Sequence, residues 1–142
     1  MFVRYAQIAA LMPVMQFSAS PWRVLPEADF QKVKDALALR EKCLPEILKA
    51  VECAKVTGEP IVRSMEFVFP GQGMERVMDQ FMVGEDLLVA PVWKQGEVAR
   101  SVRLPEGQWR CVGLGETEGD VLNGGRDVIL GENEGLVVLK RV

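Results

Sequence analysis

The sequence has no histidine and only three cysteines in 142 residues. The absence of histidine excludes Ser–His and Cys–His nucleophile pairs and every zinc site that needs a histidine ligand. The cysteines, Cys43, Cys53 and Cys111, are odd in number and widely spaced, which argues against a disulfide framework or a CxxC site. We therefore expect three small, buried apolar side chains, no bound metal and no other cofactor.

Strong positive charge and long apolar runs are also missing. The net charge is −3 and no basic run exceeds Lys140-Arg141, so nucleic-acid binding is not expected. The apolar stretch from Tyr5 to Phe17 is too short and too polar to span a membrane. With Arg4 before it and Ser18-Ala19-Ser20 after it, it mimics a weak signal peptide, but two glutamines and a proline interrupt it. An apolar content of 49% predicts a folded chain.

Residues 1–58 carry helical patterns. Phe2 to Met12 is predicted to be a short helix, apolar on most sides, and Val14 to Phe17 a short strand, followed by a loop from Ser18 to Pro26. Apolar residues at three- and four-residue spacings predict a long helix from Glu27 to Val56. Within it, Pro45 removes a backbone donor, so we expect a kink or a break near Lys42.

Residues 59–142 carry short β-like runs separated by glycine and proline turns, which predicts a small antiparallel sandwich. The expected strands are Ile61–Phe69, Leu87–Val92, Ala99–Leu104, Gln108–Val112, Asp127–Leu130 and Leu136–Leu139. The helical part does not close a core by itself, and strand followed by helix at this spacing is typical of the end of a parallel β/α barrel. The expected fold is thus an α/β barrel remnant (residues 1–58) followed by an all-β antiparallel sandwich (residues 59–142).

Five stretches of the chain carry a family resemblance. The stretch from Asp79 to Val92, DQFMVGEDLLVAPV, is similar to the signature that follows the catalytic barrel in family 31 glycoside hydrolases. Residues 2–17 resemble the last barrel helix and strand of that family, and the Leu-Arg and Leu-Pro pairs in residues 39–45 resemble its next helix. Residues 57–63 are similar to the entry of its proximal C-terminal β-sandwich, and residues 102–109 to a Leu-Pro-x-Gly-x-Trp hairpin of that sandwich.

One branch of the family is closer than the others. Typical members carry Arg-Asn-His or Arg-x-His where the last barrel strand reaches the sugar, and here Ser18 takes the place of that histidine. This departs from the α-glucosidases and resembles the branch of the myogenesis-regulating glycosidase, whose described activity is α-galactosidase-like. Parent enzymes of this branch belong to the secretory pathway, so the resemblance implies that compartment for a complete enzyme, whereas the chain itself gives no localisation.

The resemblance implies retaining hydrolysis of O-glycosidic bonds by two aspartates on barrel strands that precede the region similar to Phe2. Neither aspartate lies in this chain, so we expect no catalytic residue here and no activity of the chain alone. The acidic residues that are present are expected to be solvated or to cap turns. They are Asp79, Glu85, Asp86, Glu116, Glu118, Asp120, Glu132 and Glu134, with Asn133 among them.

Three residues are candidates for contact with a sugar: Gln16, Ser18 and Trp22. The end of a barrel strand faces the active site, amide and hydroxyl groups suit sugar hydroxyls, and an indole can stack on a pyranose ring. The alternative is that Gln16 and Ser18 satisfy local backbone and Trp22 packs on its loop. Trp93 and Trp109 are expected in the sandwich core.

Two interpretations of the whole chain stay open. It is either the C-terminal part of an α-glycosidase, which binds its carbohydrate only as the complete enzyme, or a short non-catalytic module that uses the sandwich for binding. A helix that begins at the first residue, without the barrel strands before it, favours the former. In that case Ile8, Leu11 and Met12 should be exposed; in the latter they should be buried, through self-association if necessary.

Overall fold

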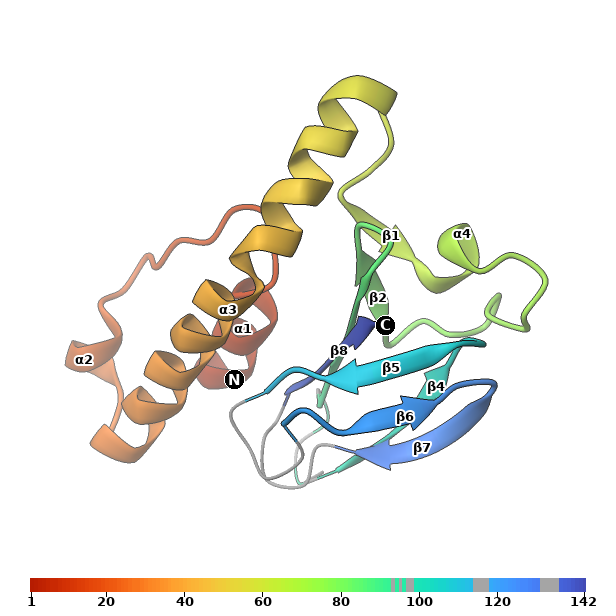
Figure 1. Ribbon diagram of the computed structural model, residues 1–142. Coiled ribbons are helices and arrows are strands. Elements are labelled where there is room, and N and C mark those ends of the chain that lie inside the picture. Colours follow the sequence, from red (N-terminus) through yellow and green to blue (C-terminus); the bar gives the residue numbers. More distant parts are fainter. Residues whose placement is uncertain (93, 95, 97–98, 114–117, 131–135) are drawn as a thin grey trace.

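The computed structural model describes residues 1–92, 94, 96, 99–113, 118–130 and 136–142. Three helices come first and the strands follow, with one short helix between them (Figure 1). The helices are α1 (Phe2–Ala9), α2 (Pro21–Val24), α3 (Glu27–Thr57) and α4 (Met65–Val68). The strands are β1 (Val62–Ser64), β2 (Phe81–Val83), β3 (Leu87–Pro91), β4 (Arg100–Leu104), β5 (Gln108–Cys111), β6 (Val121–Asn123), β7 (Arg126–Leu130) and β8 (Leu136–Arg141).

The strands form two sheets. Among the described residues, one sheet has six strands in the order β1-β2-β3-β8-β5-β6, the other pairs β4 with β7, and every pairing is antiparallel. Side chains of both sheets meet in one apolar cluster, which includes Val102 and Leu104 of β4 and Leu88 and Trp109 of the large sheet. The predicted antiparallel sandwich is therefore confirmed.

The central strands β3 and β8 are buried on both faces. Leu87 and Val89 of β3 pack with the helices, whereas Leu88 and Ala90 of the same strand point into the sandwich core. Because successive side chains of a strand alternate between faces, a strand covered on both sides must be apolar at every position. This explains why β3 reads as a continuous apolar run.

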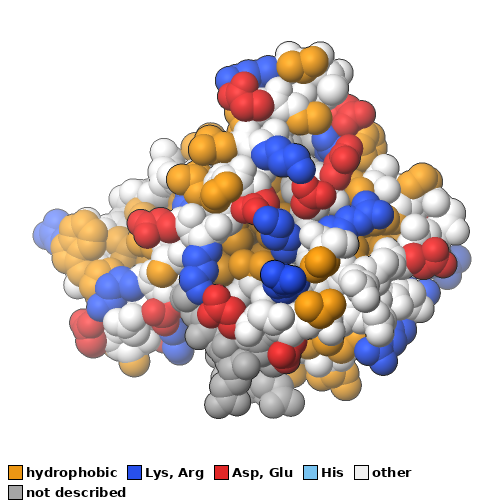
Figure 2. All heavy atoms as spheres, in the orientation of Figure 1, with side chains coloured by type: hydrophobic (Ala, Val, Ile, Leu, Met, Phe, Trp, Pro, Cys, Tyr) orange, Lys and Arg blue, Asp and Glu red, His pale blue; other side chains and the backbone are white. Residues whose placement is uncertain are grey.

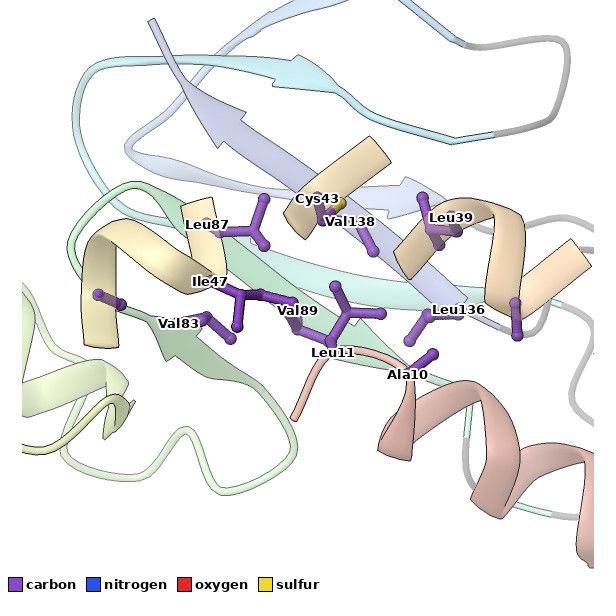
Figure 3. Close-up of a cluster of buried hydrophobic side chains, with 12 residues drawn as sticks. Ala10, Leu11, Leu39, Cys43, Ile47, Val83, Leu87, Val89, Leu136 and Val138 are labelled. Atoms are coloured by element: carbon purple, nitrogen blue, oxygen red, sulfur yellow. The ribbon is translucent and has the colours of Figure 1, made fainter. Parts of the chain in front are cut away.

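The helices share a core with the large sheet. Ala10 and Leu11, just after α1, are completely buried together with Ile47 of α3 and Val89 and Val138 of the sheet (Figure 3). Ile8 and Met12, in contrast, are half-buried. The N-terminal helices therefore pack on the same sheet that builds the sandwich, and α1 lies against α3 (Figure 1).

Helix α3 is one continuous element. Its buried positions, including Val33, Leu39, Cys43 and Ile47, recur every three or four residues and face the sheet. The helix ends at Thr57 and is capped by Gly58, whose φ of 76° is left-handed and whose N–H donates to the carbonyl of Ala54 at 2.9 Å. The predicted break near Lys42 is wrong, because the buried stripe continues on both sides of Pro45; the alternative of a kink stays a prediction.

Three further expectations need correction. Residues 14–17 form no strand, because a barrel strand needs a parallel neighbour and the described residues contain only antiparallel pairs. That residues 1–58 are the end of a barrel stays a prediction. The strand expected over Ile61–Phe69 ends at Ser64, whose hydroxyl accepts from the N–H of Phe67 and starts helix α4. The short strands β2 and β6, and helix α2 in the expected loop, were not predicted.

Candidate functional site

The glycine and acidic pair of the signature motif form the turn between β2 and β3, beneath helix α3. Gly84 has a φ of 61°, and a Cβ built on it would lie 3.0 Å from the Cβ of Ala50 on α3. Glycine is the residue that combines a left-handed turn with so close an approach of the helix. The motif is thus a packing device between sheet and helix.

The acidic residues of the motif are bound in ion pairs. Glu85 lies 3.5 Å from Arg63, whose side chain is 3% exposed and also pairs with Glu59 at 3.0 Å. Asp86 pairs with Lys49 at 2.5 Å, and the hydrogen bond to Asp86 raises the pKa of the Lys49 ammonium. The Asp86–Lys49 pair thus joins the turn to α3 and the Glu85–Arg63 pair joins it to β1, which supports the expectation that these acids are structural.

The acidic residue before β2 has the same kind of role. Asp79 pairs at 2.6 Å with Arg100, whose side chain is 5% exposed and also donates to the carbonyls of Asp79 and Pro91. Glu118 pairs with Lys42 at 2.6 Å, and the carbonyl of Asp120 accepts from the N–H of Cys111. Other acids of the predicted group, Glu116, Glu132 and Glu134, lie outside the described residues, as does Asn133.

Two of the three predicted sugar-contacting residues line one open hollow of about 530 Å³. Gln16 and Ser18 lie on its wall, opposite residues of α1 that include Phe2 and Tyr5. Phe17, between them, stacks on Phe2 with ring centroids 6.0 Å apart and planes 4° from parallel. Both candidates are exposed, so their amide and hydroxyl groups are accessible to a ligand.

The structure describes two of the three tryptophans, Trp22 and Trp109. Trp22 lies on helix α2, is 66% exposed and is not among the residues that line the hollow. Trp109 is fully buried in the sandwich core, and its indole N–H donates to the carbonyl of Pro105 at 3.0 Å. The core position predicted for Trp109 is therefore confirmed, and Trp93 lies outside the described residues.

Cysteine chemistry takes no part in the hollow. Cys43 and Cys111 are buried as expected, whereas Cys53 is only partly buried, and all three are free thiols. Burial in the core between α3 and the sheet, and next the charge of Glu46, raise the pKa of the Cys43 thiol to about 11. The Cys43 thiol is thus protonated near neutral pH, which excludes it as a nucleophile.

Sequence reasoning missed Arg40, which links α3 to the segment that carries Gln16 and Ser18. Its guanidinium donates to the carbonyls of Ala10 and Met12, both at 2.6 Å, and to that of Pro13 at 3.1 Å. The Leu-Arg pair at residues 39–40 was noted only as a family feature. Because the partners lie 27 to 30 residues away in the chain, no local pattern could have identified this contact.

Charged side chains cover the seam between α3 and the sheet. Figure 2 shows acidic and basic side chains interspersed there, without a patch of one sign. Within the part of the chain that the structure describes, no helix combines the length and apolar character needed to cross a bilayer.

The hollow offers hydrogen bonding by an amide and a hydroxyl beside aromatic rings, and its lining residues include no carboxylate.

A helical segment packs on an antiparallel sandwich, with the signature turn between them. The family model described as the glycosyl hydrolase family 31 C-terminal domain matches residues 58–129. The chain belongs to glycoside hydrolase family 31.

Curated relatives agree with this assignment. The chain is 39% identical over 111 residues to the myogenesis-regulating glycosidase of Mus musculus, an alignment that covers 78% of this chain and 16% of that protein. It is 36% identical over 101 residues to an α-glucosidase of Saccharolobus solfataricus, an alignment that covers 70% of this chain and 14% of that enzyme. The chain thus spans about one sixth of the length of these relatives.

Solved structures extend the likeness to the helices. An α-xylosidase of the same family from a soil metagenome, complexed with xylose, superposes with a TM-score of 0.82 at 29% identity, over 98% of this chain and 24% of the enzyme. A dextranase of Flavobacterium johnsoniae complexed with isomaltotriose gives a TM-score of 0.82 at 27% identity, over 99% of this chain and 18% of the dextranase. Helices and sandwich of this chain therefore have the arrangement found in both enzymes.

Proposed function

We propose that this chain is the C-terminal part of a retaining α-glycosidase that acts on α-galactosides in preference to α-glucosides. Retaining hydrolysis needs two carboxylates about 5 Å apart, one as nucleophile and one as acid and base. In the resemblance to family 31 both belong to barrel strands that precede the region of Phe2. The chain by itself therefore does not hydrolyse glycosides.

The observation that carries the substrate preference is Ser18 on the wall of the hollow, beside Gln16. Typical members of the family place a histidine at this position, where it binds sugar hydroxyls. A serine hydroxyl is shorter than an imidazole and both donates and accepts hydrogen bonds, so it meets a different arrangement of sugar hydroxyls. The third candidate, Trp22, is proposed as an exposed indole that stacks on sugar units outside the hollow.

The pairing of the local acids supports the absence of catalysis. A glycosidase nucleophile and its acid must point at one anomeric carbon. Asp79, Glu85 and Asp86 instead each pair with a different basic residue, on separate elements. None of the three lines the hollow that holds Gln16 and Ser18.

The first test separates catalysis from binding. The chain is incubated with the 4-nitrophenyl α-galactoside and α-glucoside, and no release of nitrophenol above the buffer blank is expected; turnover that purifies with the chain would refute the absence of catalytic residues. In parallel, NMR shifts are followed during titration with methyl α-galactoside and methyl α-glucoside. The amides of Gln16 and Ser18 should move with the galactoside, Ser18→Ala should abolish the response, and the exposed Ser101→Ala should leave it intact.

A second candidate function, a non-catalytic binding module, is supported by the shared core. Ala10 and Leu11 are covered by α3 and the sheet of this same chain, as a self-sufficient module requires. The proposed self-association through the N-terminal helix is then unnecessary for Leu11. An antibody to the sandwich discriminates the two: a native mass far above 15.8 kDa supports the complete glycosidase, whereas a band at 15.8 kDa supports the module.

A further inference from the structure

Arg40 reaches from the middle of α3 to the end of the first helical segment. One terminal nitrogen of its guanidinium donates to the carbonyls of Ala10 and Met12, and the other to that of Pro13. The side chain is half-buried between these elements. Three carbonyls that follow α1 thus meet on a single cation.

These carbonyls lie at and just beyond the C-terminal end of α1: Ala10 is the C-cap residue, and Met12 and Pro13 follow it. The last four carbonyls of a helix have no intrahelical donor, and the negative end of the helix dipole favours a cation there. A guanidinium supplies several donors in a rigid planar fork, which an ammonium does not. Arg40 therefore ends the helical segment and sets the direction in which the chain leaves it.

The segment that follows has few other restraints. Residues 14–19 form neither helix nor strand, and among the described residues Pro13 to Ala19 make no backbone–backbone hydrogen bond outside regular elements. Beyond the Arg40 bonds at its start, the restraints that the structure shows are the packing of Met15 against the helix–sheet core and the stacking of Phe17 on Phe2. Gln16 lies between Met15 and Phe17, Ser18 follows Phe17, and the Arg40 bonds hold the start of the segment that carries them.

We propose that Arg40 is a positioning residue that places Gln16 and Ser18 on the wall of the hollow. It acts through the backbone from Ala10 to Pro13 and is not among the residues that line the hollow. Only the identity of the ligand rests on the proposed function; the positioning is a property of the chain without sugar.

The test compares Arg40→Gln and Arg40→Lys with the control Lys55→Gln, which removes an exposed cation of the same helix. Two signals are recorded by NMR on the complete chain without sugar. The first is the proton–proton cross-relaxation between the stacked rings of Phe2 and Phe17. The second is the rate of amide exchange at Leu11 and Met12, whose N–H groups bond within the turn that Arg40 caps. The amides of β3 report global unfolding.

In Arg40→Gln the ring signal should disappear and exchange at Leu11 and Met12 should accelerate about tenfold or more, while β3 exchange stays within about twofold. Arg40→Lys should give intermediate values of both signals, and the control Lys55→Gln should change neither signal. Unchanged rings and exchange rates in Arg40→Gln would overturn the proposal. If that variant unfolds, Arg40→Lys decides, since a ring signal of wild-type strength in it would equally overturn the proposal.

The titration with sugar follows these measurements. The response of Gln16 and Ser18 to methyl α-galactoside should weaken in parallel with the ring signal. If the wild-type chain never responds to the sugar but the ring signal still depends on Arg40, the proposed function fails and the positioning by Arg40 stands.

Discussion

Gly84→Ala is the most direct test of how the signature turn packs against the long helix. Gly84 adopts a φ of 61°, and an added Cβ would lie 3.0 Å from the Cβ of Ala50, which is 4% exposed on α3. Gly71 is a matched control, because its φ of 76° is similarly left-handed but nothing lies within 4 Å of an added Cβ.

The two positions separate the conformational cost from the steric one. Forcing a residue other than glycine into the left-handed region costs about 1–2 kcal/mol, and this term applies to both variants. Overpacking a buried contact costs about 1–3 kcal/mol more, and this term applies only at Gly84. We therefore expect Gly71→Ala to lower the free energy of unfolding by about 1–2 kcal/mol and Gly84→Ala by about 2–5 kcal/mol.

Urea unfolding followed by tryptophan fluorescence measures both values by linear extrapolation. A third variant, Ala50→Gly, removes the opposing methyl group and by itself costs about 1 kcal/mol of helix propensity. Combined with Gly84→Ala it should recover about 1 kcal/mol or more relative to the sum of the single variants. Additivity within about 0.5 kcal/mol, or equal costs at Gly84 and Gly71, would refute the close-approach argument.

The remaining predictions concern charge, the sandwich core and a buried thiol. Arg63→Met should lower the free energy of unfolding, measured in urea, by about 2–3 kcal/mol, because the buried Arg63 guanidinium also donates to a carbonyl. Lys49 is exposed, so Lys49→Met should lower it by less than about 1 kcal/mol. Equal losses in the two variants would contradict the burial argument. Trp109→Phe should cost about 1–3 kcal/mol in the same assay through the lost indole hydrogen bond and the smaller ring, and a wild-type midpoint would show that neither matters. Cys43 should resist iodoacetamide in the native chain at pH 8 and react in urea, while Cys53 reacts in both, as mapped by mass spectrometry. Folding raises the pKa of the Cys43 thiol from 9.0 to about 11. The contribution of the protonated thiol to stability is therefore fully present below pH 9 and is lost as the pH rises towards 11. Between pH 9 and 11 the urea midpoint of Cys43→Ala should fall less steeply than that of the wild type.

The sandwich was largely predictable because its strands carry local signals. Alternating or continuous apolar runs between glycine and proline turns located β3, β4, β5, β7 and β8 to within about two residues. The strands that were missed, β2 and β6, have three residues each, too few to show a period. Helix α4 was predicted as strand because the apolar residues around Ser64 indicate a strand more strongly than the single capping residue Ser64 indicates a helix start.

The candidate site was predictable only in part. Gln16 and Ser18 do share one hollow, whereas Trp22 stands apart from it. Sugar binding by any of the three stays a prediction. The strand expected to carry Gln16 is absent, since strands are stabilised by neighbours and the described residues offer none there.

By itself the sequence determined the period of α3, the order of the β runs and the resemblance to family 31, because each depends on residues close together in the chain. It also determined that β3 is buried, since no strand with a solvated face is apolar at every position. Only the tertiary structure decided that the helices cover one face of that strand and the second sheet the other. It likewise decided that Arg40 holds carbonyls 27 to 30 residues away and that Asp86 pairs with Lys49 across 37 residues. Contacts of this kind leave no mark on local spacing, because they form only when packing brings distant segments together.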